Sequence, residues 1–144
     1  MIALAAVPVT PPLDKPPITV RRTEHGQLYA IAMGAMLRFP RAAGALLEEL
    51  GRCEVQEDAQ VGDDVAGLSS VVTYRDSGRD PGWVGRIRLV HPDDEDPAND
   101  KISVLSTLGA ALLGLQPGQS ILWNDRRGAS AVLCVVEVQP ALVS

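Results

Sequence analysis

The spacing of hydrophobic residues changes near residue 68. Before that point they recur every three or four residues, which predicts two amphipathic helices, one over residues 23–37 and one that begins at Pro40. Thr23 is expected to cap the first helix, and a proline suits the first position of the second. Because only a few residues separate the helices, they should form an antiparallel hairpin. Met33 and Met36 are interpreted as packing residues of the hairpin rather than ligands. The residues predicted to face the core are Leu28, Ile31, Ala32, Ala35 and Met36 in the first helix and Ala43, Leu46, Leu47 and Leu50 in the second.

After residue 68 the pattern shifts to a period near two, in short runs rich in Val, Ile and aromatic residues that are typical of β-strands. Residues 107–113 interrupt this series. They are rich in Ala and Leu, follow a possible cap at Ser106 and stop at Gly114, so they predict a short helix on the sheet. Residues 76–82 and 124–128 are expected to be hairpin loops. The order of elements predicts an α+β fold with a largely antiparallel sheet. The predicted strands cover residues 69–75, 83–91, 101–105, 120–123 and 131–138.

These patterns also predict the domain boundaries. Residues 1–17 contain five prolines, which deny the backbone the donors and the geometry of a regular element, so a disordered extension is expected there. The helical hairpin is expected over residues 18–53. Residues 54–67 are acidic and poorly periodic, which indicates a linker. The sheet domain is expected over residues 68–140.

The charge of the chain restricts its partners. The formal net charge is −5 and the Arg residues form no basic stripe, which disfavours binding to duplex nucleic acid. Only 3% of the residues are aromatic, so stacking on bases is also disfavoured, and a protein partner is expected instead. The apolar start of the chain is too short, and lacks the leading positive charge, for an export signal or a membrane span. The cytoplasm is therefore the expected location, without membrane binding.

Familiar signatures of catalysis are missing from the sequence. It contains no phosphate-loop, dinucleotide-binding, zinc-protease or serine-hydrolase motif, and His25 and His91 are expected at the surface or at element ends rather than as catalytic bases. Cys53 and Cys134 lie far apart without ligand spacing, so we expect thiols rather than a disulfide or a zinc site. The acidic residues 92–100 lack the spacing and the central Gly of a calcium loop and are interpreted as a solvated loop. We therefore expect no enzyme activity, cofactor or metal.

The most specific motif lies at residues 101–118 and reads KISVLSTLGAALLGLQPG. It resembles the central signature of the C-terminal domain of the GreA/GreB factors, in which a strand leads through a Ser-Pro-x-Gly turn into a short Ala-Leu-Leu-Gly helix. The abbreviated helical hairpin is similar to that of the Rnk family, regulators of nucleoside diphosphate kinase, within the same superfamily. The resemblance covers about residues 16–139 and implies an FKBP-like fold for the sheet domain. Further segments occur in the family's order: VTYRD at 72–76, VHPDDEDP at 90–97, GQSILW at 118–123 and VVEV at 135–138.

This resemblance implies a partner and a docking site. The globular domain of Gre relatives binds RNA polymerase at a coiled coil on the rim of the secondary channel, through the turn before the short helix. In this sequence that turn consists of Leu105, Ser106, Thr107 and Leu108, with Thr107 in place of the family's Pro. The implied function is a polymerase-binding transcription regulator that competes with Gre factors.

The predicted tip of the hairpin differs from that of the Gre factors. Gre factors present two acidic side chains at the tip of a long coiled coil, where they help to hold a catalytic magnesium ion for transcript cleavage. The tip expected here, residues 37–41, contains Arg38, Phe39 and Arg41 and no carboxylate. Two helices of about fourteen residues extend only ~20 Å each at 1.5 Å per residue. Both charge and reach predict that the protein does not stimulate cleavage.

Two other functions are compatible with the sequence. One is a small regulatory module whose hairpin serves self-association or another partner, although a monomer is favoured. The other is a peptidyl-prolyl isomerase, because the implied fold is FKBP-like. That activity needs an aromatic-lined apolar pocket, for which Tyr74, Trp83 and Trp123 are few.

Overall fold

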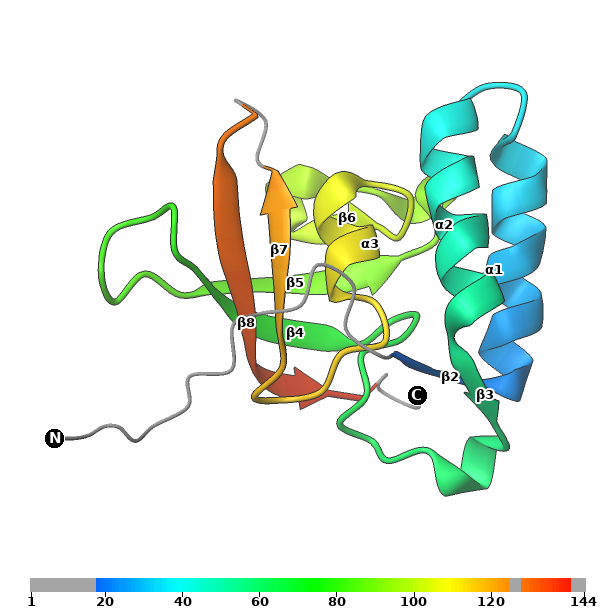
Figure 1. Cartoon of the computed structure of the whole chain (residues 1–144), viewed down its shortest axis with the longest axis horizontal. Coiled ribbons are helices and arrows are strands. Elements are labelled where there is room, and N and C mark those ends of the chain that lie inside the picture. The colour runs from blue at the N-terminus through cyan, green and yellow to red at the C-terminus, as the bar shows by residue number, and fades with distance from the viewer. Residues whose placement is uncertain (1–17, 125–127, 141–144) are drawn as a thin grey trace, which may run out of the picture.

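The computed structural model describes residues 18–124 and 128–140, and the proposed extension over residues 1–17 lies outside this part of the chain. Two helices, α1 (Arg22–Ala35) and α2 (Pro40–Arg52), lie side by side and are joined by a short turn (Figure 1). Pro40 occupies the start of α2, where its missing N–H leaves no hydrogen bond unmade. The helices bury most of the apolar positions that their spacing predicts: Leu28, Ile31, Ala32 and Ala35 in α1 and Ala43, Leu46 and Leu50 in α2.

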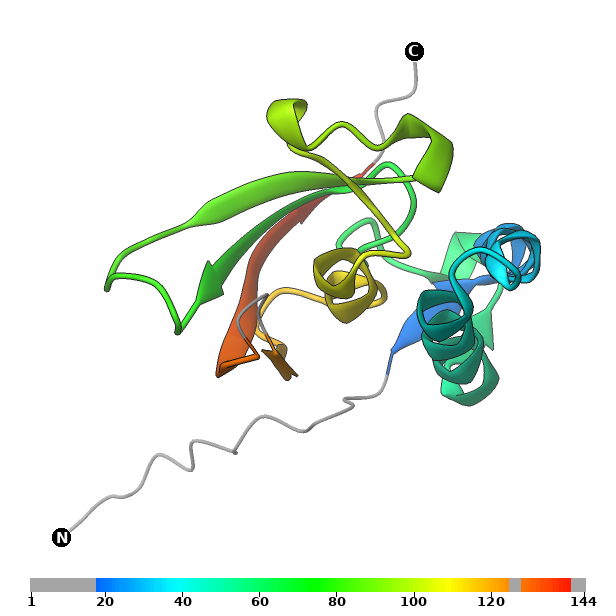
Figure 2. The same cartoon turned by 90° about the horizontal axis from the view of Figure 1, so that it is seen from above.

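The five-stranded sheet has the order β6-β5-β4-β8-β7. Neighbouring strands are antiparallel except β5 and β6, which pair in parallel. The short helix α3 (Thr107–Leu112) lies between the curved sheet and the helical hairpin (Figure 2). The chain therefore has the predicted α+β architecture, with a sheet that is largely antiparallel. The strands are β4 (Val71–Asp76), β5 (Gly85–Val90), β6 (Lys101–Ser103), β7 (Ser120–Asn124) and β8 (Ser130–Gln139), and the acidic loop contains two 3-10 turns, η2 (Pro92–Asp94) and η3 (Pro97–Asn99).

The segment predicted as a linker contains regular elements of its own. A short strand, β3 (Glu54–Gln56), pairs in parallel with β2 (Thr19–Arg21), and a 3-10 turn, η1 (Asp58–Gln60), follows. One cluster of buried side chains extends from the hairpin into the sheet domain and includes Leu28, Leu46, Val72, Leu89 and Leu112. Burial of apolar surface therefore fixes the hairpin against the sheet domain, since this surface would otherwise face water.

Two local predictions for α1 are wrong. The helix begins one residue earlier than predicted, and its cap position is Arg21, whose side chain makes no capping hydrogen bond. The Thr23 N–H, one of the donors that a helix start leaves unpaired, instead donates to Asp58 Oδ1 at 3.1 Å. The methionines do not pack inside the hairpin either, because Met33 is 50% exposed and Met36 is 38% exposed.

Candidate docking site

The turn Leu105–Leu108 joins β6 to α3 and borders a groove of about 830 Å³. Ser106, Thr107 and Leu108 line this groove directly, whereas Leu105 packs against the core beneath it. Thr107 is exposed and the other three residues are half-buried. The remaining lining residues come from strands β4, β6 and β7 and from two loops: Tyr74, Asp76, Gly78, Arg79, Glu95, Pro97, Ile102, Trp123 and Asn124.

A set of short-range hydrogen bonds fixes the shape of this turn. Ser106 Oγ accepts from the Gly109 N–H at 2.9 Å, as an N-terminal cap of α3, and donates to the Ser103 carbonyl at 2.7 Å. Ser103 Oγ in turn accepts from the Leu105 N–H at 3.0 Å. The Ser103 N–H donates to Glu95 Oε2 at 3.1 Å, which ties the acidic loop to the same strand. The prediction that Ser106 caps this helix is confirmed.

Close backbone packing holds α3 in place behind the turn. A Cβ atom at Gly109 would overlap the Ser103 carbonyl oxygen, so only glycine allows this approach. Gly114 ends the helix region at a φ of +80°, a left-handed conformation that favours glycine. Gly109 is thus needed for the close packing of α3, and Gly114 for the change of chain direction after it.

Aromatic side chains form one wall of the groove. The rings of Tyr74 and Trp83 make an edge-to-face contact with centroids 5.6 Å apart, and both approach Gly85, where a larger side chain would collide with them. Burial raises the pKa of the Tyr74 hydroxyl. Trp123 lies on the same groove, and its indole Nε1 is the one buried side-chain nitrogen or oxygen in the described part of the chain that has no hydrogen-bond partner. The structure therefore brings Tyr74 and Trp123 to one groove, with Trp83 supporting Tyr74.

Charged residues on the rim of this groove were not singled out from the sequence. Asp76 is buried at the end of β4, where its Oδ1 accepts from the Gly78 N–H at 2.9 Å and stabilises the loop over residues 76–82. The Arg79 guanidinium stacks on the Trp83 ring at 4.7 Å from the centroid. The Asp-Ser-Gly segment that begins at Asp76 is a recognisable turn signal, but only the folded chain places it beside α3.

The predicted hairpin tip is separate from this groove. Leu37 is 98% exposed and Phe39 is 53% exposed, and the Arg38 guanidinium lies 5.5 Å from the centroid of the Phe39 ring. Arg41 is exposed in the first turn of α2. None of these residues lines the groove beside α3, so the predicted docking turn and the predicted tip form two independent surfaces.

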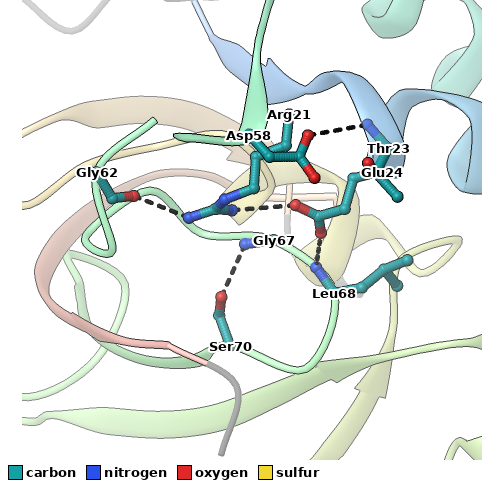
Figure 3. A network of polar contacts seen from close by, with 8 residues as sticks. All are labelled: Arg21, Thr23, Glu24, Asp58, Gly62, Gly67, Leu68 and Ser70. Atoms are coloured by element: carbon teal, nitrogen blue, oxygen red, sulfur yellow. Dashed lines mark hydrogen bonds and ion pairs between the residues drawn. The ribbon is translucent and has the colours of Figure 1, made fainter. Parts of the chain in front are cut away.

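A polar network anchors the opposite end of the hairpin (Figure 3). Glu24 of α1 accepts from the Leu68 N–H and pairs with the Arg21 guanidinium at 3.0 Å. Arg21 also donates to the Gly62 carbonyl at 2.8 Å. A side chain at Gly67 would collide with the Glu24 carboxylate and displace it from this network. This network connects α1, the segment after η1 and the start of the sheet domain, and sequence patterns alone did not predict it.

The histidines and cysteines have local partners, and the Cys53 thiol donates to the Leu50 carbonyl at 3.3 Å, the same oxygen that His25 approaches. His25 Nε2 lies 3.2 Å from the Leu50 carbonyl, between the two helices, and His91 Nδ1 accepts from the Asp93 N–H at 3.0 Å. Cys53 and Cys134 are half-buried free thiols. Among the described residues no three His, Cys, Asp or Glu side chains are arranged to hold a metal ion. No helix in that part of the chain is long and apolar enough to cross a membrane.

Comparison with known families identifies the sheet domain. The model of the family described as "Transcription elongation factor, GreA/GreB, C-term" matches residues 60–140. The chain belongs to this GreA/GreB family. The match includes the predicted docking turn, the short helix and all five strands of the large sheet.

Individual relatives agree with this family membership. The chain is 35% identical over 97 residues to the "Regulator of nucleoside diphosphate kinase" of Escherichia coli (strain K12), which covers 67% of this chain and 70% of the relative. It is 30% identical over 124 residues to the "Transcription elongation factor GreA" of Syntrophobacter fumaroxidans, covering 80% and 78% of the two chains. Among solved structures, a GreA/GreB transcription elongation factor from Nitrosomonas europaea matches with a TM-score of 0.68 and 31% identity, covering 87% of this chain and 99% of that one.

Proposed function

We propose that this GreA/GreB family member is a transcription regulator that binds RNA polymerase at the rim of the secondary channel and does not stimulate transcript cleavage. The observation that carries the proposal is the turn Leu105–Leu108. Four hydrogen bonds around Ser103 and Ser106 hold it in one shape, so docking would cost little conformational entropy. Its exposed Thr107 and half-buried Leu108 border a groove with aromatic walls, a surface suited to the side chains of a partner helix.

The length and charge of the hairpin support the proposal that the protein does not stimulate transcript cleavage. Helix α1 has 14 residues, which at 1.5 Å per residue is a length of ~21 Å. The tip carries Arg38, Phe39 and Arg41, and residues 35–42 contain no Asp or Glu that could help to hold a magnesium ion. A hairpin of this length and charge would occupy the channel entrance without completing the catalytic site.

A competition experiment tests both the binding to polymerase and the lack of cleavage stimulation. Bacterial core polymerase is immobilised, loaded with this protein and challenged with a GreA factor. We expect the protein to bind at micromolar concentration and to be displaced by GreA. In a stalled-complex assay it should slow GreA-dependent transcript cleavage and add none of its own. Failure to bind polymerase contradicts the docking proposal, and cleavage above the background of polymerase alone contradicts the proposal for the tip.

The groove favours one alternative, peptidyl-prolyl isomerisation, because Tyr74 and Trp123 line it and the sheet domain is proposed to be FKBP-like. A proline-isomerisation assay on a short peptide separates the two functions. Measurable turnover that is lost on Tyr74→Ala, with the fold retained by circular dichroism, favours the enzyme. The expected result is no turnover above buffer. The Escherichia coli relative is named a regulator of nucleoside diphosphate kinase, so this kinase is a further partner to include in the binding assays.

A further inference from the structure

Beyond the exposed Arg22 in its first turn, the outer face of α1 carries no charge, which is unusual for an exposed helix surface. Residues 25–37 contain no Asp, Glu, Lys or Arg, although Gly26, Ala30, Met33 and Leu37 are all exposed. The neighbouring α2 has the ordinary pattern, with the charged residues Arg41, Glu48 and Arg52 on its exposed side. An exposed helix face that stays uncharged over residues 25–37 is expected to pack against another surface.

The four exposed residues define the geometry of that packing. Gly26, Ala30, Met33 and Leu37 follow one another at intervals of four, three and four residues, the spacing of a coiled-coil seam. If a second copy of α1 packs antiparallel about a two-fold axis between positions 31 and 32, Gly26 faces Leu37 and Ala30 faces Met33. Every pair then joins a small residue to a large one, so that each large side chain enters the space left by a small one. The face is therefore complementary to itself under a two-fold axis, as an interface between identical subunits requires.

The charges at the two ends of the hairpin support the same arrangement. At the tip, Arg38 and Arg41 form no ion pair with any described residue. At the base, a groove of about 930 Å³ runs beside Gln27 and Ala30 of α1 and is bordered by the carboxylates Asp58, Asp63 and Asp94. The two arginines at the base, Arg21 and Arg22, are paired with Glu24 and Glu57, so the unpaired charge there is acidic. Antiparallel packing places the basic, apolar tip of each copy at the acidic base of the other. Parallel packing would place like charges together at both ends, which costs free energy.

We propose that two copies of this chain form a two-fold dimer through the outer face of α1, with Gly26, Ala30, Met33 and Leu37 at its centre. The partner is a second copy rather than an unrelated protein, because both the size of the facing residues and the charge of the two ends are self-complementary. In Figure 1 α1 forms the right-hand edge of the molecule, and the four central residues of the proposed interface are exposed. None of the four central residues lines the groove beside the docking turn, and the proposal does not depend on polymerase binding.

Sedimentation equilibrium of the full chain tests the dimer. We expect a mass twice that of the 15.3 kDa chain at tens of micromolar protein, with dissociation on dilution. Met33→Glu places a carboxylate at the centre of the seam and should weaken the dimer at least tenfold, without unfolding the chain because Met33 is 50% exposed. The matched control is Val136→Glu on β8, where Val136 is 42% exposed, and it should leave the dimer unchanged. A wild-type monomer at every concentration, or a dimer equally stable in both variants, overturns the proposal.

Disulfide trapping tests the antiparallel register. In a background with Cys53→Ser and Cys134→Ala, one protein carries Ala30→Cys and another carries Met33→Cys. Under mild oxidation the mixture should form cross-linked dimers faster than either protein alone, because Ala30 of one copy faces Met33 of the other. Faster self-linking of each single variant indicates parallel packing and contradicts the proposal. A third variant, Gly44→Cys on α2, serves as the control and should link to neither.

Discussion

The turn before α3 and the tip of the hairpin are both short connections next to a helix, but they are constructed in opposite ways. In the α3 turn, side-chain hydrogen bonds from Ser103 and Ser106 fix the backbone, and the residues are half-buried around the exposed Thr107. At the tip, backbone bonds such as Phe39 N–H to the Ala35 carbonyl hold the chain, and Leu37 is almost fully exposed. Replacing Ser103 or Ser106 should therefore destabilise the fold, whereas the side chains of the tip can change with little effect on stability.

The strongest test of this contrast is Gly109→Ala. The added Cβ would overlap the Ser103 carbonyl oxygen, which belongs to the backbone and cannot turn aside, so we expect a loss of about 2–4 kcal/mol in the free energy of unfolding. Gly44→Ala in α2 is the matched control, because nothing lies within 4 Å of its added Cβ. It should gain about 0.5–1 kcal/mol through helix propensity. Urea unfolding measures both, and equal stabilities for the two variants would contradict the packing described for α3.

Ser106→Ala should have the next largest effect. It removes an acceptor for the Gly109 N–H and a donor to the Ser103 carbonyl, and loss of such a cap typically costs about 1 kcal/mol. Thr107→Ala, one position further on, should change the free energy of unfolding by less than about 0.5 kcal/mol, as is usual for exposed positions. If thermal or urea unfolding gives the reverse order, the hydrogen bonds of Ser106 do not determine the shape of the turn.

The contact between Thr23 and Asp58 at the base of the hairpin should make the free energy of unfolding depend on pH. Hydrogen bonds from the Thr23 side chain and backbone N–H hold the pKa of Asp58 below its ordinary value. A carboxyl group whose pKa is lowered by folding contributes stability above its unfolded pKa of about 3.9, and this contribution is lost as pH falls through the folded pKa. Asp58→Asn should therefore be less stable than the parent near neutral pH, and the difference should shrink below about pH 4.

Urea unfolding at a series of pH values measures this dependence. Asp80→Asn provides the control, because the Asp80 side chain makes no hydrogen bond with a described residue, and its difference from the parent should stay small throughout. A stability difference for Asp58→Asn that is constant from pH 7 to pH 2 would falsify the assignment.

The smallest effects are expected at the tip. Leu37→Ser and Arg38→Ala should each change the free energy of unfolding by less than about 0.5 kcal/mol, because the side chains lie on the surface and Arg38 only stacks on Phe39. The melting temperatures of these variants and of Ser106→Ala show which of the two turns contributes more to the stability of the fold. A tip variant that is less stable than Ser106→Ala would mean that the tip also supports the fold.

Short-range signals in the sequence were enough to predict the sheet domain. The Ser106 cap and the stop at Gly114 lie within a few residues of the helix that they delimit, and each long strand has its own alternating pattern. The pairing of β2 with β3 was missed because it joins Thr19 to Glu54 through strands of only three residues, too short to show a period. Thr23 was mistaken for a cap because the group that completes the helix start, Asp58, is 35 residues away.

The methionines show a different limit of sequence reasoning. Periodicity discriminates poorly between the two faces of a helix when both contain apolar residues. In α1 the spacing correctly assigned Leu28 and Ile31 to the core, but it did not show that Met33 and Met36 face outwards. The groove beside α3 was likewise beyond prediction, because Tyr74, Ser106 and Trp123 meet there from three separate parts of the chain.

The most direct test of the docking proposal is the affinity of the purified chain for bacterial core RNA polymerase after a single change at position 107. Thr107→Glu adds a charge at the exposed first residue of α3, where a carboxylate is compatible with the helix start, so the fold should persist. Gln116→Glu adds the same charge at an exposed position that does not line the groove. We predict at least tenfold weaker binding for Thr107→Glu and a change within twofold for Gln116→Glu. Equal affinities for the two variants would contradict the assignment of the docking turn.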